Sequence, residues 1–183
     1  METHLESGSH RPVWVHSHEE SNWYAVHTKP RHEKQIAAQF REKQVCTFLP
    51  LFRQIHRWSD RRQVVEVPMF SCYAFVRLIQ SAEERLKVLR TPGVFGFVGN
   101  ERQGTPIPDE QIECLRKAIG KNVPFLPHPY LSAGKRVRIR GGSLDGVEGV
   151  LASQGKDQSL VISVELLQRS VSIRVEGYDI ELV

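Results

Sequence analysis

The stretch Pro68-Met69-Phe70-Ser71-Cys72-Tyr73-Ala74-Phe75-Val76 decides the fold of the segment around it. Residues 73–78 are rich in aromatic and β-branched side chains, which predicts a strand. Alternate residues of a strand share a face, so Tyr73 and Phe75 are expected to point the same way, with Phe70 close before them. These three rings are either ordinary core or a protein-binding surface, since aromatic residues dominate the energetics of interfaces.

Strands and helices are predicted on both sides of this stretch. A first helix is expected to begin at Thr28 as its cap, with Pro30 in the first turn. A second is expected at a capping box that starts with Ser81, with Leu86 and Leu89 on its buried face. Further strands are expected at residues 23–27, 48–52, 64–67 and 94–98, and a third helix from residue 108. Strands in series with helices predict an α+β fold, here an antiparallel sheet flanked by helices in an α/β sandwich.

The pattern changes after residue 120. Residues 121–132 contain three prolines and no periodicity, which is typical of a linker. Beyond it, apolar residues such as Val137 and Ile139 alternate with arginines, which predicts a small SH3-like β-barrel with a glycine-rich turn at 141–146. The expected organisation is a disordered tail at 1–21, an α/β domain at 22–120, the linker at 121–132 and the barrel at 133–183.

Composition excludes several classes of protein. The chain has 183 residues, 40% hydrophobic and 25% charged, which is an ordinary globular composition. No apolar run approaches the roughly 18 residues of a membrane span, and no signal peptide is visible. Three well-separated cysteines fit neither a disulfide framework nor a metal motif, which favours a reducing cytoplasm. No cofactor, metal or catalytic motif is found, so no enzyme is expected.

Charge is concentrated in the middle of the chain. Residues 22–118 hold sixteen Lys and Arg against ten Asp and Glu, a net +6, whereas the whole chain carries +4. Lys29, Arg31 and His32 lie together at the start of the first predicted helix, and Arg57 and Arg61 lie in a predicted hairpin tip. A basic segment is compatible with a nucleic-acid partner or with a solvated face, and for the hairpin tip both interpretations remain open.

Several motifs in fixed order resemble the NusG family of transcription factors. Trp23-Tyr24-Ala25-Val26 is similar to the start of its N-terminal (NGN) domain, and residues 68–76 are similar to its Phe-Pro-Gly-Tyr strand. Residues 91–99 and Pro106-Ile107-Pro108 fit later segments of that domain. Gly134-Lys135-Arg136-Val137-Arg138-Ile139 resembles the KOW motif that opens the family's C-terminal barrel. The segment 23–62 looks closest to specialised paralogs of the RfaH and UpxY type.

The resemblance implies an elongation and antitermination factor that binds the clamp helices of RNA polymerase. The residues that it assigns to this contact are His27, Phe70, Tyr73 and Phe75. Ser71 and Cys72 replace the family's Pro-Gly, so a less constrained turn is expected there. The alternative is an RNA-binding or ribosome-binding module, because KOW barrels also occur in ribosomal proteins.

Two further surfaces follow from the resemblance. Lys29 matches a basic position that touches the non-template DNA strand, with Arg31 and His32 beside it. On the barrel, Leu166, Leu167 and Arg169 are expected to form a partner surface for ribosomal protein S10. Leu167 stands where housekeeping members carry a Phe, so binding of the termination factor Rho is not expected. The protein is expected to be a monomer with no membrane partner.

Overall fold

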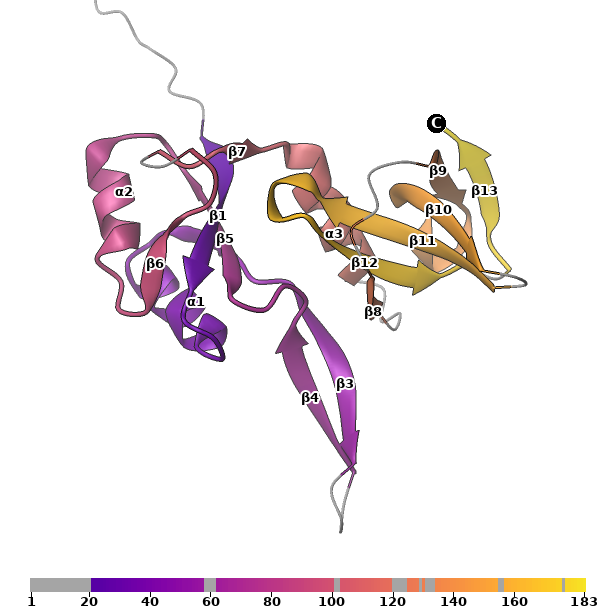
Figure 1. Ribbon diagram of the computed structural model, residues 1–183, viewed down its shortest axis with the longest axis horizontal. Helices are drawn as coiled ribbons and strands as arrows, with labels where there is room; N and C mark the ends of the chain where they lie inside the picture. The colour runs from indigo at the N-terminus through magenta and orange to yellow at the C-terminus, as the bar shows by residue number, and fades with distance from the viewer. Residues whose placement is uncertain are drawn as a thin grey trace, which may run out of the picture.

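The computed structural model describes residues 21–57, 62–100, 103–119, 125–128, 130, 134–154, 157–175 and 177–183. They form two units side by side (Figure 1). The N-terminal unit is built on a five-stranded antiparallel sheet with the order β2-β5-β1-β6, and β7 also pairs with β1. Its strands are β1 (Asn22–Thr28), β2 (Cys46–Phe48), β5 (Tyr73–Leu78), β6 (Val94–Phe97) and β7 (Pro106–Ile107).

Two helices, α1 (Glu33–Glu42) and α2 (Ala82–Leu89), flank this sheet. Alternate residues of β1 and β5 turn toward them and form one of the two hydrophobic clusters of the molecule. The fully buried members of this cluster are Val26, Phe40, Ala74, Val76 and Val88. The other face of the sheet therefore carries the remaining residues of β1 and β5.

The helix boundaries differ in part from the sequence prediction. The predicted cap at Ser81 is confirmed, because its side chain accepts a hydrogen bond from the backbone N–H of Glu84 at 3.2 Å. The reciprocal bond of a capping box is replaced, since the Ser81 N–H donates to the Ile79 carbonyl at 2.7 Å. The predicted cap at Thr28 is wrong, since Thr28 ends β1 and α1 begins only at Glu33. The predicted buried face of α2 is also wrong: Leu86 and Leu89 are 44% and 40% exposed. Val88 faces the core instead. Helical residues turn by about 100° each, so Leu86 and Leu89 lie about 200° and 100° around the helix from Val88 and point outward.

A two-stranded hairpin of β3 (Leu51–Arg57) and β4 (Arg62–Pro68) projects from the N-terminal unit (Figure 1). The prediction of one strand over 48–52 is wrong, because Leu49 and Pro50 separate the end of β2 from the start of β3. Pro50 has no N–H to donate to a ladder, and its carbonyl accepts the N–H of Met69 at 2.9 Å, which closes the base of the hairpin.

The C-terminal unit is a six-stranded antiparallel sheet with the order β13-β9-β10-β11-β12-β8. Its strands are β8 (Phe125–His128), β9 (Lys135–Arg140), β10 (Glu148–Gln154), β11 (Asp157–Val164), β12 (Arg169–Arg174) and β13 (Asp179–Leu182). Two short 3₁₀ helices join them, η1 (Gly142–Leu144) and η2 (Glu165–Leu167). The outer strands β13 and β8 do not pair with each other in the described residues, so the expected barrel is a curled, open sheet there.

The alternation that predicted this unit is confirmed. Val137 and Ile139 are buried, and Arg138 and Arg140 point outward to carboxylates, with Arg140 Nε 2.6 Å from Glu181. The predicted turn is also found, with positive φ at Gly141, Gly142 and Gly146. One difference concerns the stretch predicted as linker: Phe125–His128 within it form β8, paired with β12. Phe125 is only 5% exposed, and burying its ring accounts for the extra strand.

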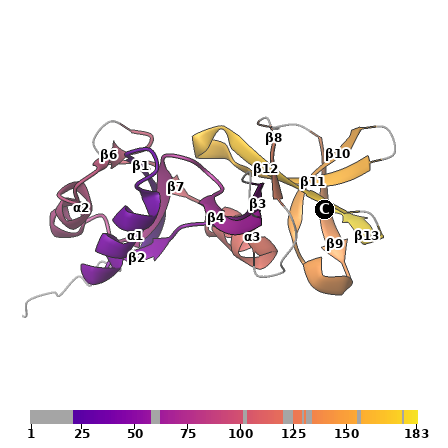
Figure 2. The ribbon, with the colours of Figure 1, turned by 90° about the horizontal axis from the view of Figure 1, so that it is seen from below.

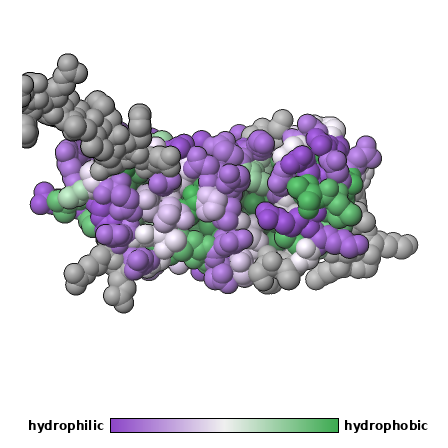
Figure 3. All heavy atoms as spheres, turned by 90° about the horizontal axis from the view of Figure 1, so that it is seen from above, coloured by the Kyte–Doolittle hydropathy of each residue, from purple (hydrophilic) through white to green (hydrophobic). Residues whose placement is uncertain are grey.

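The helix α3 (Asp109–Ile119) lies between the two units (Figure 2). Its buried residues Ile112, Leu115 and Ala118 belong to a cluster that takes members from both units. Its Arg116 guanidinium lies 4.8 Å from the centre of the Trp23 ring in β1. Far from this helix, hydrophobic side chains also reach the surface near the end of the chain (Figure 3), where Leu182 is 69% exposed.

Candidate functional site

The candidate site is the face of the N-terminal sheet that α1 and α2 leave uncovered. In the register of β1 and β5, His27 lies opposite Tyr73, and Ala25 lies opposite Phe75. Directly paired residues of an antiparallel ladder share a face, so His27, Tyr73 and Phe75 are brought together as predicted. Phe70 joins them from the preceding turn, with its ring 5.9 Å from that of Phe75.

Burial divides these residues into two groups. Phe70 and Phe75 are 2% and 0% exposed and pack edge to face, so they are interior side chains in this arrangement. Tyr73 is half-buried and His27 is exposed. The His27 ring lies 5.4 Å from Tyr73 and 5.1 Å from Phe95, which continues the row of rings toward the edge of the sheet. The aromatic face therefore runs from a covered end at Phe70 to an open end at Phe95.

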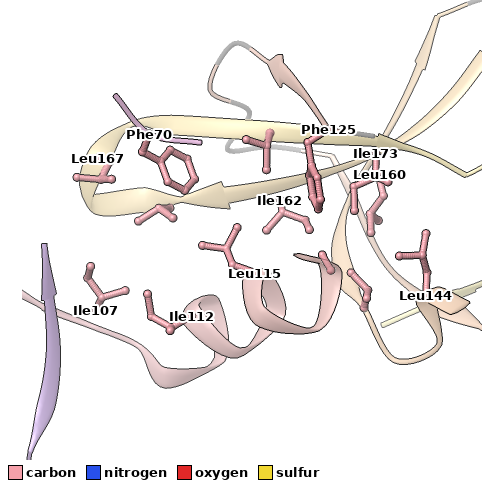
Figure 4. Packing of buried hydrophobic residues seen from close by; sticks show 14 of the residues in the cluster. Phe70, Ile107, Ile112, Leu115, Phe125, Leu144, Leu160, Ile162, Leu167 and Ile173 are labelled. Carbon is pink, nitrogen blue, oxygen red and sulfur yellow. The ribbon is translucent and has the colours of Figure 1, made fainter. Parts of the chain in front are cut away.

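The C-terminal unit covers the buried end. Phe70, Phe75 and Leu167 belong to one hydrophobic cluster, and Figure 4 shows the Phe70 ring beside Leu167 at the turn between β11 and β12. The guanidinium of Arg169 lies 5.7 Å from the centre of the Tyr73 ring, within the range of a cation–π contact. The partner surface predicted on the C-terminal unit thus lies against the polymerase-binding surface predicted on the N-terminal one. The sequence alone had given no sign that these two surfaces meet.

Contacts of α3 also hold the two units together. The backbone N–H of Glu165 donates to the side-chain oxygen of Gln111 at 3.3 Å. The Cys114 thiol donates to the carbonyl of Glu148 at 2.8 Å. Burial raises the pKa of Cys114 to about 11, so its thiol stays protonated at neutral pH and acts as a structural donor and not as a nucleophile.

The turn before Tyr73 is more constrained than the sequence suggested. Cys72 occupies the left-handed region with a φ of 71°, where glycine is the favoured residue. A carboxylate oxygen of Glu33 accepts the Cys72 N–H at 2.8 Å, and the Cys72 carbonyl accepts the N–H of Thr28 at 2.8 Å. Glu33 is itself 4% exposed. The side chain of Glu33 in α1 and the backbone N–H of Thr28 in β1 therefore fix this turn without the Pro-Gly pair.

Replacing Cys72 with glycine is expected to stabilise the protein by about 1 kcal/mol. A left-handed non-glycine residue costs about 1–2 kcal/mol, and part of this gain is offset by the greater freedom of glycine in the unfolded chain. The measurement is the free energy of unfolding in urea. Cys46→Gly is the matched control, because Cys46 is exposed in the strand β2, where glycine should destabilise. Equal destabilisation by both substitutions would contradict the prediction.

Phe95 is a member of this face that sequence analysis missed. The pairing of β1 with β6 shifts between His27 and Thr28: His27 lies opposite Gly96, but Thr28 lies opposite Val94. Phe95 is the extra residue of this bulge, and a bulge redirects a side chain relative to simple alternation. Its ring meets His27 instead of following Phe97 to the helix-covered face. The signal in the sequence was Gly96, which a strand interior disfavours and which often marks a bulge.

The predicted nucleic-acid residues lie in the connection from β1 to α1. Lys29 and Arg31 are exposed, and the Lys29 N–H donates to the Gly93 carbonyl at 2.7 Å, next to β6. His32 is half-buried, with its Nδ1 2.9 Å from the Pro30 carbonyl. These residues are therefore near the open end of the aromatic face. In the hairpin, Arg57 pairs with Arg62 in register, and Arg61 lies outside the described residues.

The described residues contain no group of three or more His, Cys, Asp or Glu side chains placed to hold a metal ion. The histidines of the first twenty residues lie outside them. Over the same residues, no helix is both long and apolar enough to cross a membrane.

Comparison with known proteins decides the family. A family model described as "Transcription termination factor nusG" matches residues 21–116, which is more than half of the chain. The chain belongs to the NusG family. The predicted membership is thereby confirmed, and the family consists of transcription termination and antitermination factors.

Individual NusG proteins agree with this assignment over most of their length. "Transcription termination/antitermination protein NusG" of Staphylococcus aureus (strain Mu50) is 28% identical over 173 residues, which cover 87% of this chain and 94% of that protein. A solved structure described as "Domain interaction in Thermotoga maritima NusG" superimposes with a TM-score of 0.54 at 20% identity. It covers 85% of this chain and 93% of its own, and shows that the fold is shared.

Proposed function

We propose that this NusG-family protein is a specialised elongation and antitermination factor that binds the clamp helices of RNA polymerase through its aromatic face. The observation that carries the proposal is a row of rings on one face of the sheet, in which Phe70 packs on Phe75 and Tyr73 packs on His27, which in turn meets Phe95. A row of this kind offers large apolar contact area with little side-chain entropy to lose, as interface anchors do. Such a clamp adds no chemistry of its own and acts by holding the polymerase in one conformation.

The side chains that cover the face in this structure support the proposal. Leu167 is 8% exposed in the cluster with Phe70, and Arg169 places a guanidinium over Tyr73. A helical protein surface that presents an aliphatic side chain and an arginine at this spacing would satisfy the same rings. The polymerase therefore competes with the C-terminal unit for one surface, and its apparent affinity is reduced by the fraction of molecules in which the surface is covered.

The C-terminal surface of Leu166, Leu167 and Arg169 is proposed as the site for ribosomal protein S10. Leu167 is buried in the arrangement that the structure shows, here called closed, in which the C-terminal unit covers the aromatic face. Binding of S10 therefore also requires the two units to separate. Two ligands that both bind the open state raise each other's affinity, because each depletes the closed one. Rho is not proposed as a partner, since Leu167 replaces the ring that the family presents to it.

The experiment that tests the proposal is binding of the full chain to core RNA polymerase in the absence of RNA, followed by a pausing assay on the same preparation. Binding together with reduced pausing is expected. Retention on RNA or on ribosomes without binding to polymerase would favour the alternative, an RNA-binding or ribosome-binding KOW module, and would overturn the proposal.

The basic residues beside the open end are proposed to contact the non-template DNA strand. Lys29→Ala should lower the slope of log affinity against log salt for a single-stranded oligonucleotide by about 0.7, which corresponds to one phosphate contact. Binding to polymerase should not change, and the loss of antipausing should differ between templates. Lys117→Ala is the control, because Lys117 is an exposed lysine of α3. An unchanged salt slope and unchanged pausing on every template would remove DNA from the mechanism.

A further inference from the structure

The C-terminal unit covers one end of the aromatic face and leaves the other end exposed. This difference bears on the rate at which a partner can bind. Phe70 and Phe75 are buried, whereas Phe95 is 63% exposed at the other end of the same row of rings. Among the described residues, Phe95 is the only Phe, Tyr or Trp whose side chain is largely exposed. Exposed aromatic rings that continue a binding surface are a feature of interaction sites more than of ordinary protein surface.

The local backbone places Phe95 there. The bulge at Phe95 turns its ring toward His27, at 5.1 Å, and away from the helix-covered face. Opposite His27, the strand carries Gly96, and a Cβ at that position would meet no atom within 4 Å. The space beside His27 is therefore open, and an approaching side chain can reach both rings while the C-terminal unit stays in place.

We propose that Phe95 and His27 form the site of first contact for the partner of the aromatic face, which reaches them before the C-terminal unit has left Tyr73 and Phe70. This inference rests on the proposed function, because the occupant is the same polymerase surface. A partner limited to a fully uncovered face could bind only the open fraction of molecules. First contact at the open end lets binding begin on the closed molecule, and the partner then displaces Arg169 and Leu167 along the row of rings.

Phe95→Ala is expected to affect the association rate and the dissociation rate differently. In the full chain, Phe95→Ala should lower the association rate constant with core polymerase about fivefold and change the dissociation rate constant less than twofold. In a chain that also carries Leu167→Ala, which loosens the cover, the effect of Phe95→Ala on association should shrink to less than twofold. Phe95 is exposed, so its removal is not expected to disturb the core.

The matched control is Leu89→Ala, which removes an exposed apolar side chain from α2, outside the row of rings, and should leave both rate constants unchanged. Stopped-flow fluorescence with labelled polymerase measures the rates. An equal slowing of association in both backgrounds, or none in either, would overturn the inference and leave the proposed function intact. Failure of the unchanged chain to bind polymerase at all would overturn the proposed function, and the inference with it.

Discussion

A chain with Tyr73 replaced by alanine is expected to bind core RNA polymerase at least thirtyfold more weakly than the unchanged chain. Tyr73 lies at the middle of the aromatic face, in ring contact with His27, and is only half-buried. Loss of a central aromatic anchor costs about 2 kcal/mol or more of binding free energy, which is roughly thirtyfold in Kd. Phe70→Ala is a poorer test, because Phe70 is 2% exposed and its removal would also destabilise the fold.

Two variants make this measurement decisive. Tyr73→Phe keeps the ring and should bind within about threefold of the unchanged chain, since the contacts of Tyr73 with His27 and Arg169 are made by its ring. Tyr178→Ala removes a half-buried tyrosine from the C-terminal unit, where its hydroxyl meets Ser143 at 2.8 Å, and should not weaken binding. If Tyr73→Ala and Tyr178→Ala bind alike, the aromatic face is not the polymerase site.

Leu167→Ala is expected to act in the opposite direction and to tighten polymerase binding about tenfold. Truncation of a buried leucine typically costs about 2–5 kcal/mol. Part of this loss falls on the contact between Leu167 and the cluster that contains Phe70, which holds the two units together. If the closed state loses about 1.4 kcal/mol relative to the open state, the fraction of open molecules rises about tenfold. The measurement is the Kd for core polymerase in an equilibrium titration.

The control for this prediction is Leu126→Ala in the same unit. Leu126 is 62% exposed in β8, so its truncation should leave closure and affinity unchanged. Circular dichroism of both variants reports whether the C-terminal sheet remains folded. A folded Leu167→Ala chain whose affinity equals that of the unchanged chain would show that the cover does not compete with the polymerase.

Local signals predicted the parts of the fold that depend on neighbours in the chain. The helix cap at Ser81 needs only residues three apart, and the alternation around Val137 and Ile139 needs only one strand. Both were therefore readable from the sequence. The predicted buried face of α2 was wrong because Leu86 and Leu89 and the observed Val88 are all apolar, and only packing against the sheet decides which of them turns inward.

The shared face of His27, Tyr73 and Phe75 could be predicted from the sequence, but the burial of the neighbouring Phe70 could not. Strand alternation and the resemblance brought His27, Tyr73 and Phe75 to one face, as the register shows. Nothing local in the sequence indicates that Leu167, about a hundred residues away, packs into the cluster of Phe70. Long-range contacts between two units depend on surface complementarity, which periodicity does not report. Phe95 was missed for a related reason, because a bulge breaks the alternation that the prediction assumed.

The strand β8 shortens the connection between the two units. The length of this connection sets how strongly the C-terminal unit competes with the polymerase for the aromatic face. The helix α3 ends at Ile119 and β8 begins at Phe125, so five residues join them where a linker of a dozen was expected. Fully extended, this connection reaches only about 20 Å. A tether of this length keeps the detached C-terminal unit at an effective concentration in the millimolar range. Dilution therefore cannot open the molecule, and a free peptide that copies residues 165–169 would have to reach a similar concentration before it could take the unit's place.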